Sequence, residues 1–152
     1  MLIDHANNAL LTPMLNGEGF LLHLSNLFSI LGRIAFPIFV FFIVEGFFKT
    51  RSRKRYLMTL LIFGVISEVP FDMAFWGGFV NIQHQNVMWS LLICVIMLCG
   101  IKKYPDFSVI FVGMGCFAAW FIKSDYEYIG PLAVGCMYLF RERAVYKNVA
   151  TA

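Results

Sequence analysis

The chain has 152 residues, of which 60% are hydrophobic and only 14% are charged, and its formal net charge is +3. This composition leaves too little polar surface to cover a water-soluble globule and excludes an ordinary soluble enzyme. The basic residues form no folded basic domain, which argues against a nucleic-acid partner. The four cysteines lie in apolar runs without the spacing of metal ligands, so we expect no metal. The composition therefore predicts an integral membrane protein, with residues 1–152 forming a single all-α transmembrane helical bundle.

The first apolar segment, near residues 1–15, is shorter than the about 20 residues that a membrane helix needs. We expect the chain to begin part-way through a helix, so that this segment is short or truncated. Residues 20–31 place apolar side chains on one face with polar ones between them, which predicts an interfacial helix. A membrane segment follows near residues 32–48, with Pro37 in its interior as a predicted kink.

Four more apolar segments complete the pattern, which brings the expected number of membrane segments to about six. Polar or turn-forming residues separate them, as connections between helices require. The expected segments lie near residues 56–75, 87–101, 107–122 and 129–140.

The distribution of lysine and arginine predicts the orientation of the bundle. Ten of the chain's 12 basic residues fall on one side if the segments alternate in direction, in the connections after residues 48 and 101 and in the C-terminal tail. By the positive-inside rule this side is cytoplasmic. We therefore expect a multi-pass protein of the bacterial inner membrane with a cytoplasmic C-terminus.

Several charged and polar residues lie within these apolar segments at similar expected depth, in the outer half of the bundle. Glu68 and Asp72 are four residues apart and share one helical face. Because an isolated charge in hydrocarbon costs at least ~2.5 kcal/mol, we expect these groups to share a polar cavity. The alternative is that Arg33 pairs with an acid only to hold helices together. The expected members of the cluster are Asp4, His5, Arg33, Glu68, Asp72, Asn86 and Asp125.

Two further features carry candidate roles. His5, beside Asp4, is a candidate general base, although a histidine in this setting is about as often structural or proton-relaying as catalytic. Glu45 lies one turn from Lys49, which predicts a snorkelling or ion-paired residue. The turn between the second and third segments holds five cations in seven residues, more than orientation requires. It therefore predicts a site for an anionic ligand, an acidic lipid or a phosphate-bearing cofactor, with Arg51, Arg53, Lys54 and Arg55 as candidates.

Several blocks of the sequence resemble the TraX family of conjugal-transfer membrane proteins. They are DHAN at residues 4–7, GRIAFPIFVFFIVEGFF at 32–48, LLIFGVISEVPFD at 60–72, QNVMWSLLI at 85–93 and SDYEYIGPLAV at 124–134. The family is similar to the wider group of transmembrane acyltransferases. It usually has more residues before the Asp-His pair and further helices after the last of these blocks.

The resemblance implies a membrane-embedded acyltransferase that uses acetyl-CoA or another acyl-CoA. The implied acceptor is an amine or hydroxyl presented at the membrane, such as the N-terminus of conjugative pilin. His5 matches the histidine of the family's Asp-His motif, which implies the base, and the basic turn would meet the CoA phosphates. The competing hypothesis is a non-enzymatic transporter or pilus assembly factor, in which the buried charges carry protons or ions.

Overall fold

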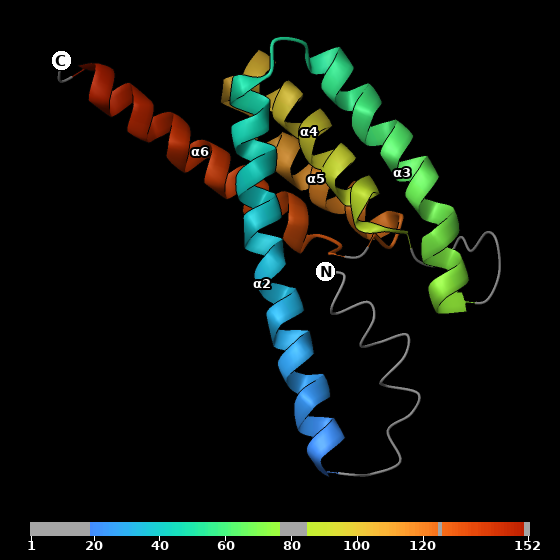
Figure 1. Ribbon diagram of the computed structural model, residues 1–152. Helices are drawn as coiled ribbons and strands as arrows, with labels where there is room; N and C mark the ends of the chain where they lie inside the picture. The colour runs from blue at the N-terminus through green and yellow to red at the C-terminus, as the bar shows by residue number, and fades with distance from the viewer. Residues whose placement is uncertain (1–18, 77–84, 125, 151–152) are drawn as a thin grey trace. The chain divides into compact units, whose positions relative to one another are not determined.

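The computed structural model describes residues 19–76, 85–124 and 126–150 and is helical throughout this part of the chain (Figure 1). Within those ranges no strand forms, and an isolated bridge pairs Gln85 with Ser124. The all-α prediction is therefore confirmed. The helices are α2 (Gly19–Lys49), α3 (Arg53–Trp76), α4 (Val87–Lys103), the short 3₁₀ helix η3 (Pro105–Phe107), α5 (Ser108–Phe121) and α6 (Ile129–Ala150).

The chain divides into two compact units, residues 1–39 and residues 40–152. In the first unit the described residues belong to α2, and Pro37 lies inside the helix as expected. Residues 20–31 and 32–48, expected as an interfacial helix that leads into a membrane segment, form one unbroken helix, because α2 runs from Gly19 to Lys49. The interfacial position of residues 20–31 stays a prediction. Gly32 is the only break signal at this junction, and a single glycine costs a helix only about 1 kcal/mol.

The helices predicted at residues 56–75, 87–101 and 107–122 coincide with α3, α4 and α5 to within a few residues. The helix predicted at residues 129–140 begins where α6 begins, but α6 extends well beyond residue 140, to Ala150. Among the described residues, two helical stretches are long and apolar enough to cross a membrane, His23–Lys49 and Arg53–Ala74, and Pro105–Phe121 is apolar but shorter. The segment at residues 1–15 lies outside the described residues. The count of six spans therefore stays a prediction.

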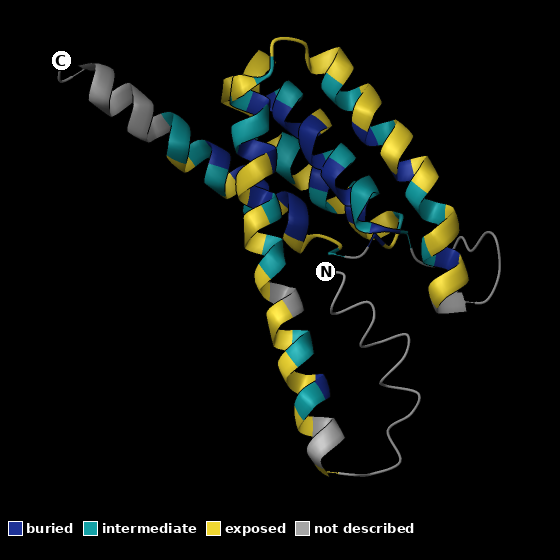
Figure 2. Cartoon of the chain, in the orientation of Figure 1, coloured by how far each residue is buried: buried dark blue, intermediate teal, exposed yellow. Residues whose placement is uncertain are grey.

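In the second unit α4 is the central helix and packs against α3, α5 and α6. Its buried residues run along the length of the helix and are apolar apart from Ser90 (Figure 2). Glycines allow close approach here, since a Cβ on Gly100 would lie 2.5 Å from the Phe111 ring and one on Gly115 would lie 2.8 Å from the Met97 sulfur. Small residues at helix contacts are the usual means of packing helices in membranes.

The outer faces of α3 and α5 expose large apolar side chains (Figure 2). Phe63 is 55% exposed, Ile66 63%, Phe117 64% and Phe121 72%. A surface of this kind suits hydrocarbon rather than water, because exposed apolar patches of this extent are rare on soluble monomers. The cations gather instead at the helix ends, at Lys49 and in the last turn of α4.

Candidate functional site

A carboxylate on α3 is held by two side chains from the start of α4. Glu68 Oε2 accepts a hydrogen bond from the indole nitrogen of Trp89 at 2.8 Å and a second one from the side-chain amide of Asn86. Asn86 and Trp89 lie three residues apart around the first turn of α4, so both donors can converge on one oxygen. The carboxylate is therefore fixed in position by a neighbouring helix.

Asn86 is itself fixed by its other contacts. It is 4% exposed and caps the N-terminus of α4, where its Oδ1 accepts from the Met88 amide at 2.9 Å. Its Nδ2 also donates to the carbonyl oxygen of Gly64 on α3 at 3.1 Å. An asparagine side chain that satisfies a helix cap and bridges to a second helix is rigid. Asn86 thus sets the position of Glu68 relative to α4.

The second oxygen of Glu68 differs from the first. Glu68 Oε1 is buried and has no hydrogen-bond partner among the residues that the structure describes. Asp72, one turn further along α3, is fully buried. A buried carboxylate oxygen without a partner is costly unless a proton, a cation or a donor reaches it. Oε2 therefore anchors the Glu68 carboxylate, while Oε1 is available to bind a ligand or a proton.

The connection before α4 is tied to the loop after α5. The Gln85 amide donates to the Lys123 carbonyl at 3.2 Å, and the Ser124 hydroxyl donates to the Ala119 carbonyl at 3.3 Å. Lys123 has φ 51° and Glu127 has φ 38°, a left-handed conformation that non-glycine residues adopt at a cost of roughly 1 kcal/mol or more. These contacts place the α5–α6 loop at the N-terminus of α4, beside Asn86.

The predicted members of the polar cluster fall into two groups. Glu68, Asp72 and Asn86 are described, and Glu68 and Asn86 are in direct contact. Asp4, His5 and Asp125 lie outside the described residues, as does the side chain of Arg33 on α2. The shared cavity and the individual roles therefore stay predictions. Sequence reasoning missed Trp89, although an indole N–H in an apolar helix signals a buried acceptor nearby.

The basic turn between α2 and α3 lines a small surface cavity that is open to solvent. Its volume is about 300 Å³, and its lining residues are Thr50, Arg51, Ser52, Arg55, Tyr56 and Thr59. We call it the α3 cavity. Ser52 caps α3, since its hydroxyl accepts from the Arg55 amide at 3.3 Å and its carbonyl accepts from the Tyr56 amide at 3.1 Å.

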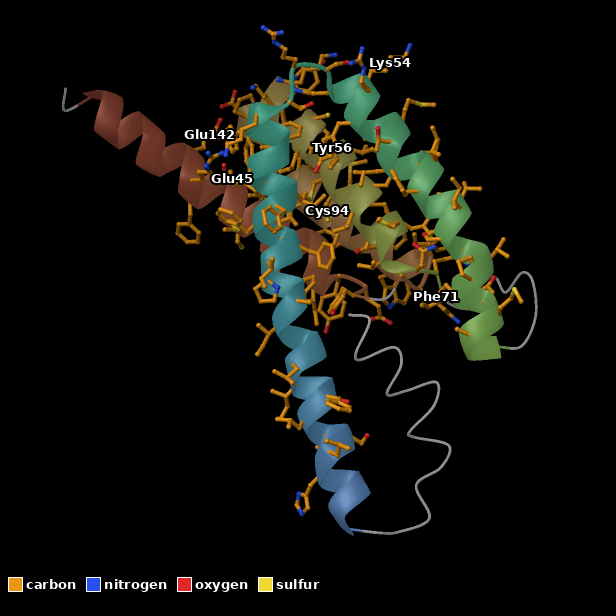
Figure 3. All side chains as sticks on the ribbon, in the orientation of Figure 1. Glu45, Lys54, Tyr56, Phe71, Cys94 and Glu142 are labelled. Atoms are coloured by element: carbon orange, nitrogen blue, oxygen red, sulfur yellow. The ribbon has the colours of Figure 1, made fainter. Side chains whose placement is uncertain are left out.

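The four predicted cofactor-binding cations do not behave alike. Arg51 and Arg55 line the α3 cavity. The Arg53 guanidinium instead lies over the Phe47 ring, 5.3 Å from its centroid. Lys54 is exposed and points away from the helices (Figure 3). Only two of the four therefore face a space where a ligand could bind.

Glu45 joins α2 to α6 at the same end of the second unit (Figure 3). The pair expected with Lys49 forms at 3.3 Å, but Glu45 also pairs with Arg141 at the shorter distance of 2.8 Å. The Arg141 guanidinium lies 4.1 Å from the centroid of Phe48, whose ring stacks on Tyr138 at 5.0 Å. The main partner of Glu45 is thus on another helix, which neighbour spacing could not reveal.

Replacing Glu45 with alanine should lower the free energy of unfolding by about 1–3 kcal/mol, because Arg141 is left without its partner in a partly buried position. The matched control is Lys49→Ala, which should cost at most about 0.5 kcal/mol. Lys49 is 77% exposed, whereas Glu45 is 17% exposed. Thermal unfolding in detergent measures both. Equal losses in the two variants would contradict the assignment of Arg141 as the main partner.

Comparison with known proteins gives one family and one relative. The model of the TraX protein family matches residues 1–152. The chain is also 35% identical over 80 residues to a protein of Dichelobacter nodosus described as "Probable fimbrial assembly protein FimC, serogroup H1". This match covers 44% of the chain and 30% of that protein, so the chain spans less than a third of the relative's length. No solved structure matches the chain.

Proposed function

The chain belongs to the TraX family, and from this premise we propose that it is a membrane-embedded acyltransferase that uses acetyl-CoA or another acyl-CoA. Its acceptor is an amine presented at the membrane, such as the N-terminus of a pilin subunit. The similar Dichelobacter protein is described as a fimbrial assembly protein, which supports an acceptor of this class. The proposed location is the bacterial inner membrane, with the basic turn and the C-terminus in the cytoplasm.

The observation that carries the proposal is the anchored carboxylate of Glu68. It lies on α3, a helix long and apolar enough to cross a membrane, and its Oε2 is held by Trp89 and Asn86. A charged group in such a helix is a functional residue by default, because its cost must be offset. With one oxygen fixed, the other can accept a hydrogen bond from the N–H of a neutral amine and position it for reaction.

The reaction itself transfers an acyl group from sulfur to nitrogen. The neutral amine attacks the thioester carbonyl carbon and forms the new C–N bond, while His5 takes the proton that the nitrogen loses. The tetrahedral oxyanion collapses, the C–S bond breaks, and the CoA thiolate leaves and recovers the proton from His5. The role of His5 rests on its match to the family's Asp-His motif, whose acid is Asp4. No step requires a metal.

A second function remains in competition with this one. Glu68 and Asp72 are carboxylates one turn apart on an apolar helix, and Asp72 is fully buried. Buried carboxylates in membrane helices also mark proton and ion paths. The competing proposal is therefore a non-enzymatic proton- or ion-coupled transporter or pilus assembly factor, and it assigns Asp72 the central role.

Proteoliposomes that contain the chain separate the two functions. They are supplied with acetyl-CoA and an acceptor peptide, and both acetylation and pH-driven flux are recorded. Acyltransferase function predicts acetylation that depends on acetyl-CoA, with no flux above empty liposomes. Flux that needs no acyl-CoA, survives His5→Ala and fails in Asp72→Asn would overturn the proposal and support the transporter.

A further inference from the structure

We infer that the α3 cavity is a binding site for a phosphate monoester, with Arg51 and Arg55 as its two charged ligands. The cavity lies at the junction of α2 and α3, where the turn carries five cations. Orientation in a membrane requires only that these charges be present. Two of them, Arg51 and Arg55, line one open cavity together, where a single oxyanion could contact both guanidinium groups.

Some hydrogen-bond donors that line the cavity are already used within the protein, and the others are free to bind a ligand. The Thr50 hydroxyl donates to the Ser52 carbonyl at 3.4 Å and the Thr59 hydroxyl donates to the Arg55 carbonyl at 2.9 Å, so both are already engaged. The Ser52 hydroxyl accepts from the Arg55 amide, and among the described residues its own proton contacts no acceptor. The free donors are therefore the two guanidinium groups and the Ser52 hydroxyl.

The charge of the cavity is not neutralised by the protein. In the part of the chain that the structure describes, the two ion pairs both involve Glu45, and neither includes Arg51 or Arg55. The cavity also adjoins the N-terminus of α3, a helix of 24 residues whose dipole adds partial positive charge there. Two guanidiniums at a helix N-terminus suit an oxyanion that accepts bidentate hydrogen bonds.

Charge and size together favour a phosphate monoester. A phosphate monoester carries about −1.5 to −2 charges at pH 7, which two arginines balance, whereas a carboxylate or a phosphodiester carries one. The volume of about 300 Å³ is at the lower end of the range for small-molecule sites. The cavity would therefore hold a phosphate group with the atoms next to it, while the rest of a larger ligand lies outside.

Two ligands could bring this group to the cytoplasmic end of the helices. One is the 3′-phosphate of CoA, and for this ligand the inference rests on the proposed acyltransferase function. The other is the headgroup of phosphatidic acid, which needs no enzyme. Both are phosphate monoesters. Each can be tested by comparing it with a related ligand that lacks the monoester.

The test uses the full chain in phosphatidylcholine nanodiscs, with CoA and 3′-dephospho-CoA as the soluble probes. The site predicts that CoA binds at least about tenfold more tightly than 3′-dephospho-CoA, since loss of the monoester leaves two cations without their partner. Arg51→Gln and Arg55→Gln should each weaken CoA binding by about tenfold and reduce its preference over the dephospho form. Lys54→Gln is the matched control, because it removes the same charge from the same turn outside the cavity, and it should change binding less than about twofold.

The lipid arm replaces part of the phosphatidylcholine with phosphatidic acid or, as a diester control, phosphatidylglycerol. Displacement of CoA by phosphatidic acid alone, lost in Arg55→Gln, supports the site with a lipid ligand. Preferential CoA binding without any acetyl transfer supports the site and counts against the enzyme. The inference is overturned if neither monoester is preferred over its control. It is also overturned if Lys54→Gln weakens binding as much as Arg55→Gln in variants that unfold at the wild-type temperature.

Discussion

Replacing His5 with alanine should lower the rate of acyl transfer by at least about 100-fold, the lower range for loss of a general base. The substitution removes the group that accepts the amine proton as the C–N bond forms. Expression and the unfolding temperature should stay unchanged, because the proposed role is chemical. The assay is transfer of a labelled acetyl group from acetyl-CoA to an acceptor peptide by the chain in nanodiscs.

His23→Ala is the matched control for this prediction. His23 lies on α2 and is exposed, so the same substitution there removes an imidazole without any proposed role in the reaction. Its rate of transfer should match the wild type within about twofold. Undiminished transfer in His5→Ala would show that another group takes the proton, and an equal loss in both variants would show a nonspecific effect.

Asn86→Ala should lower the free energy of unfolding by about 2–4 kcal/mol, the largest stability effect that we expect of a single polar residue here. The variant removes the cap of α4 and the bridge to Gly64. It also leaves Glu68 with the Trp89 donor as its one side-chain partner among the described residues. Acyl transfer should fall as well, because Glu68 is no longer fixed relative to α4. Thermal unfolding and the transfer assay report the two effects separately.

Two variants show which contact of Asn86 matters. Ser67→Ala removes a different donor to the same Gly64 carbonyl, which the Ser67 hydroxyl contacts at 3.2 Å, and should cost about 1 kcal/mol or less. Asn86→Asp keeps an acceptor for the Met88 amide but replaces the amide donor with a second carboxylate beside Glu68. It should therefore destabilise at neutral pH at least as much as alanine. A loss below about 0.5 kcal/mol in Asn86→Ala would contradict the proposed bridge between α3 and α4.

The helices were predictable from sequence because their signals are local. The run from Gly32 to Phe48, the basic turn and the following apolar run predict two helices and a connection, and the structure has α2 and α3 at these places. Residues 20–31 and 32–48 differ in their polar pattern, yet they form one helix, because no turn-forming residues separate them. A glycine alone does not end a helix that has no turn signal beside it.

The contacts of the site were harder to predict from the sequence, because they depend on which faces of helices distant in sequence pack together. The i, i+4 rule predicted the pair between Glu45 and Lys49, which forms, but could not reveal Arg141. In the same way Glu68 and Asp72 were placed on one face, whereas Trp89 as a donor to Glu68 required knowledge of how α3 and α4 pack. Local spacing fixes neighbours along one helix and leaves partners on other helices open.

For the basic turn, too, the sequence alone does not reveal which side chains face a common space. In sequence its arginines and lysines are interchangeable members of one cluster. In the structure the Arg53 guanidinium lies over Phe47, Lys54 is exposed, and Arg51 and Arg55 line the α3 cavity. Side-chain direction around the first turn of α3 separates Arg53, Lys54 and Arg55, because successive residues on a helix point about 100° apart. Arg51 precedes α3 and lines the cavity from the turn. The turn therefore carries a specific expectation about which of its cations bind an anion.

The most direct test of the proposed acyltransferase is the mass of the acceptor. Membrane proteins from cells with and without the chain are compared by intact-mass and peptide mass spectrometry, with His5→Ala cells as a third sample. The account predicts a mass increase of about 42 Da, one acetyl group, on a specific amine in wild-type cells alone. No acylated amine that depends on the chain, or the same acylation in His5→Ala cells, would contradict it.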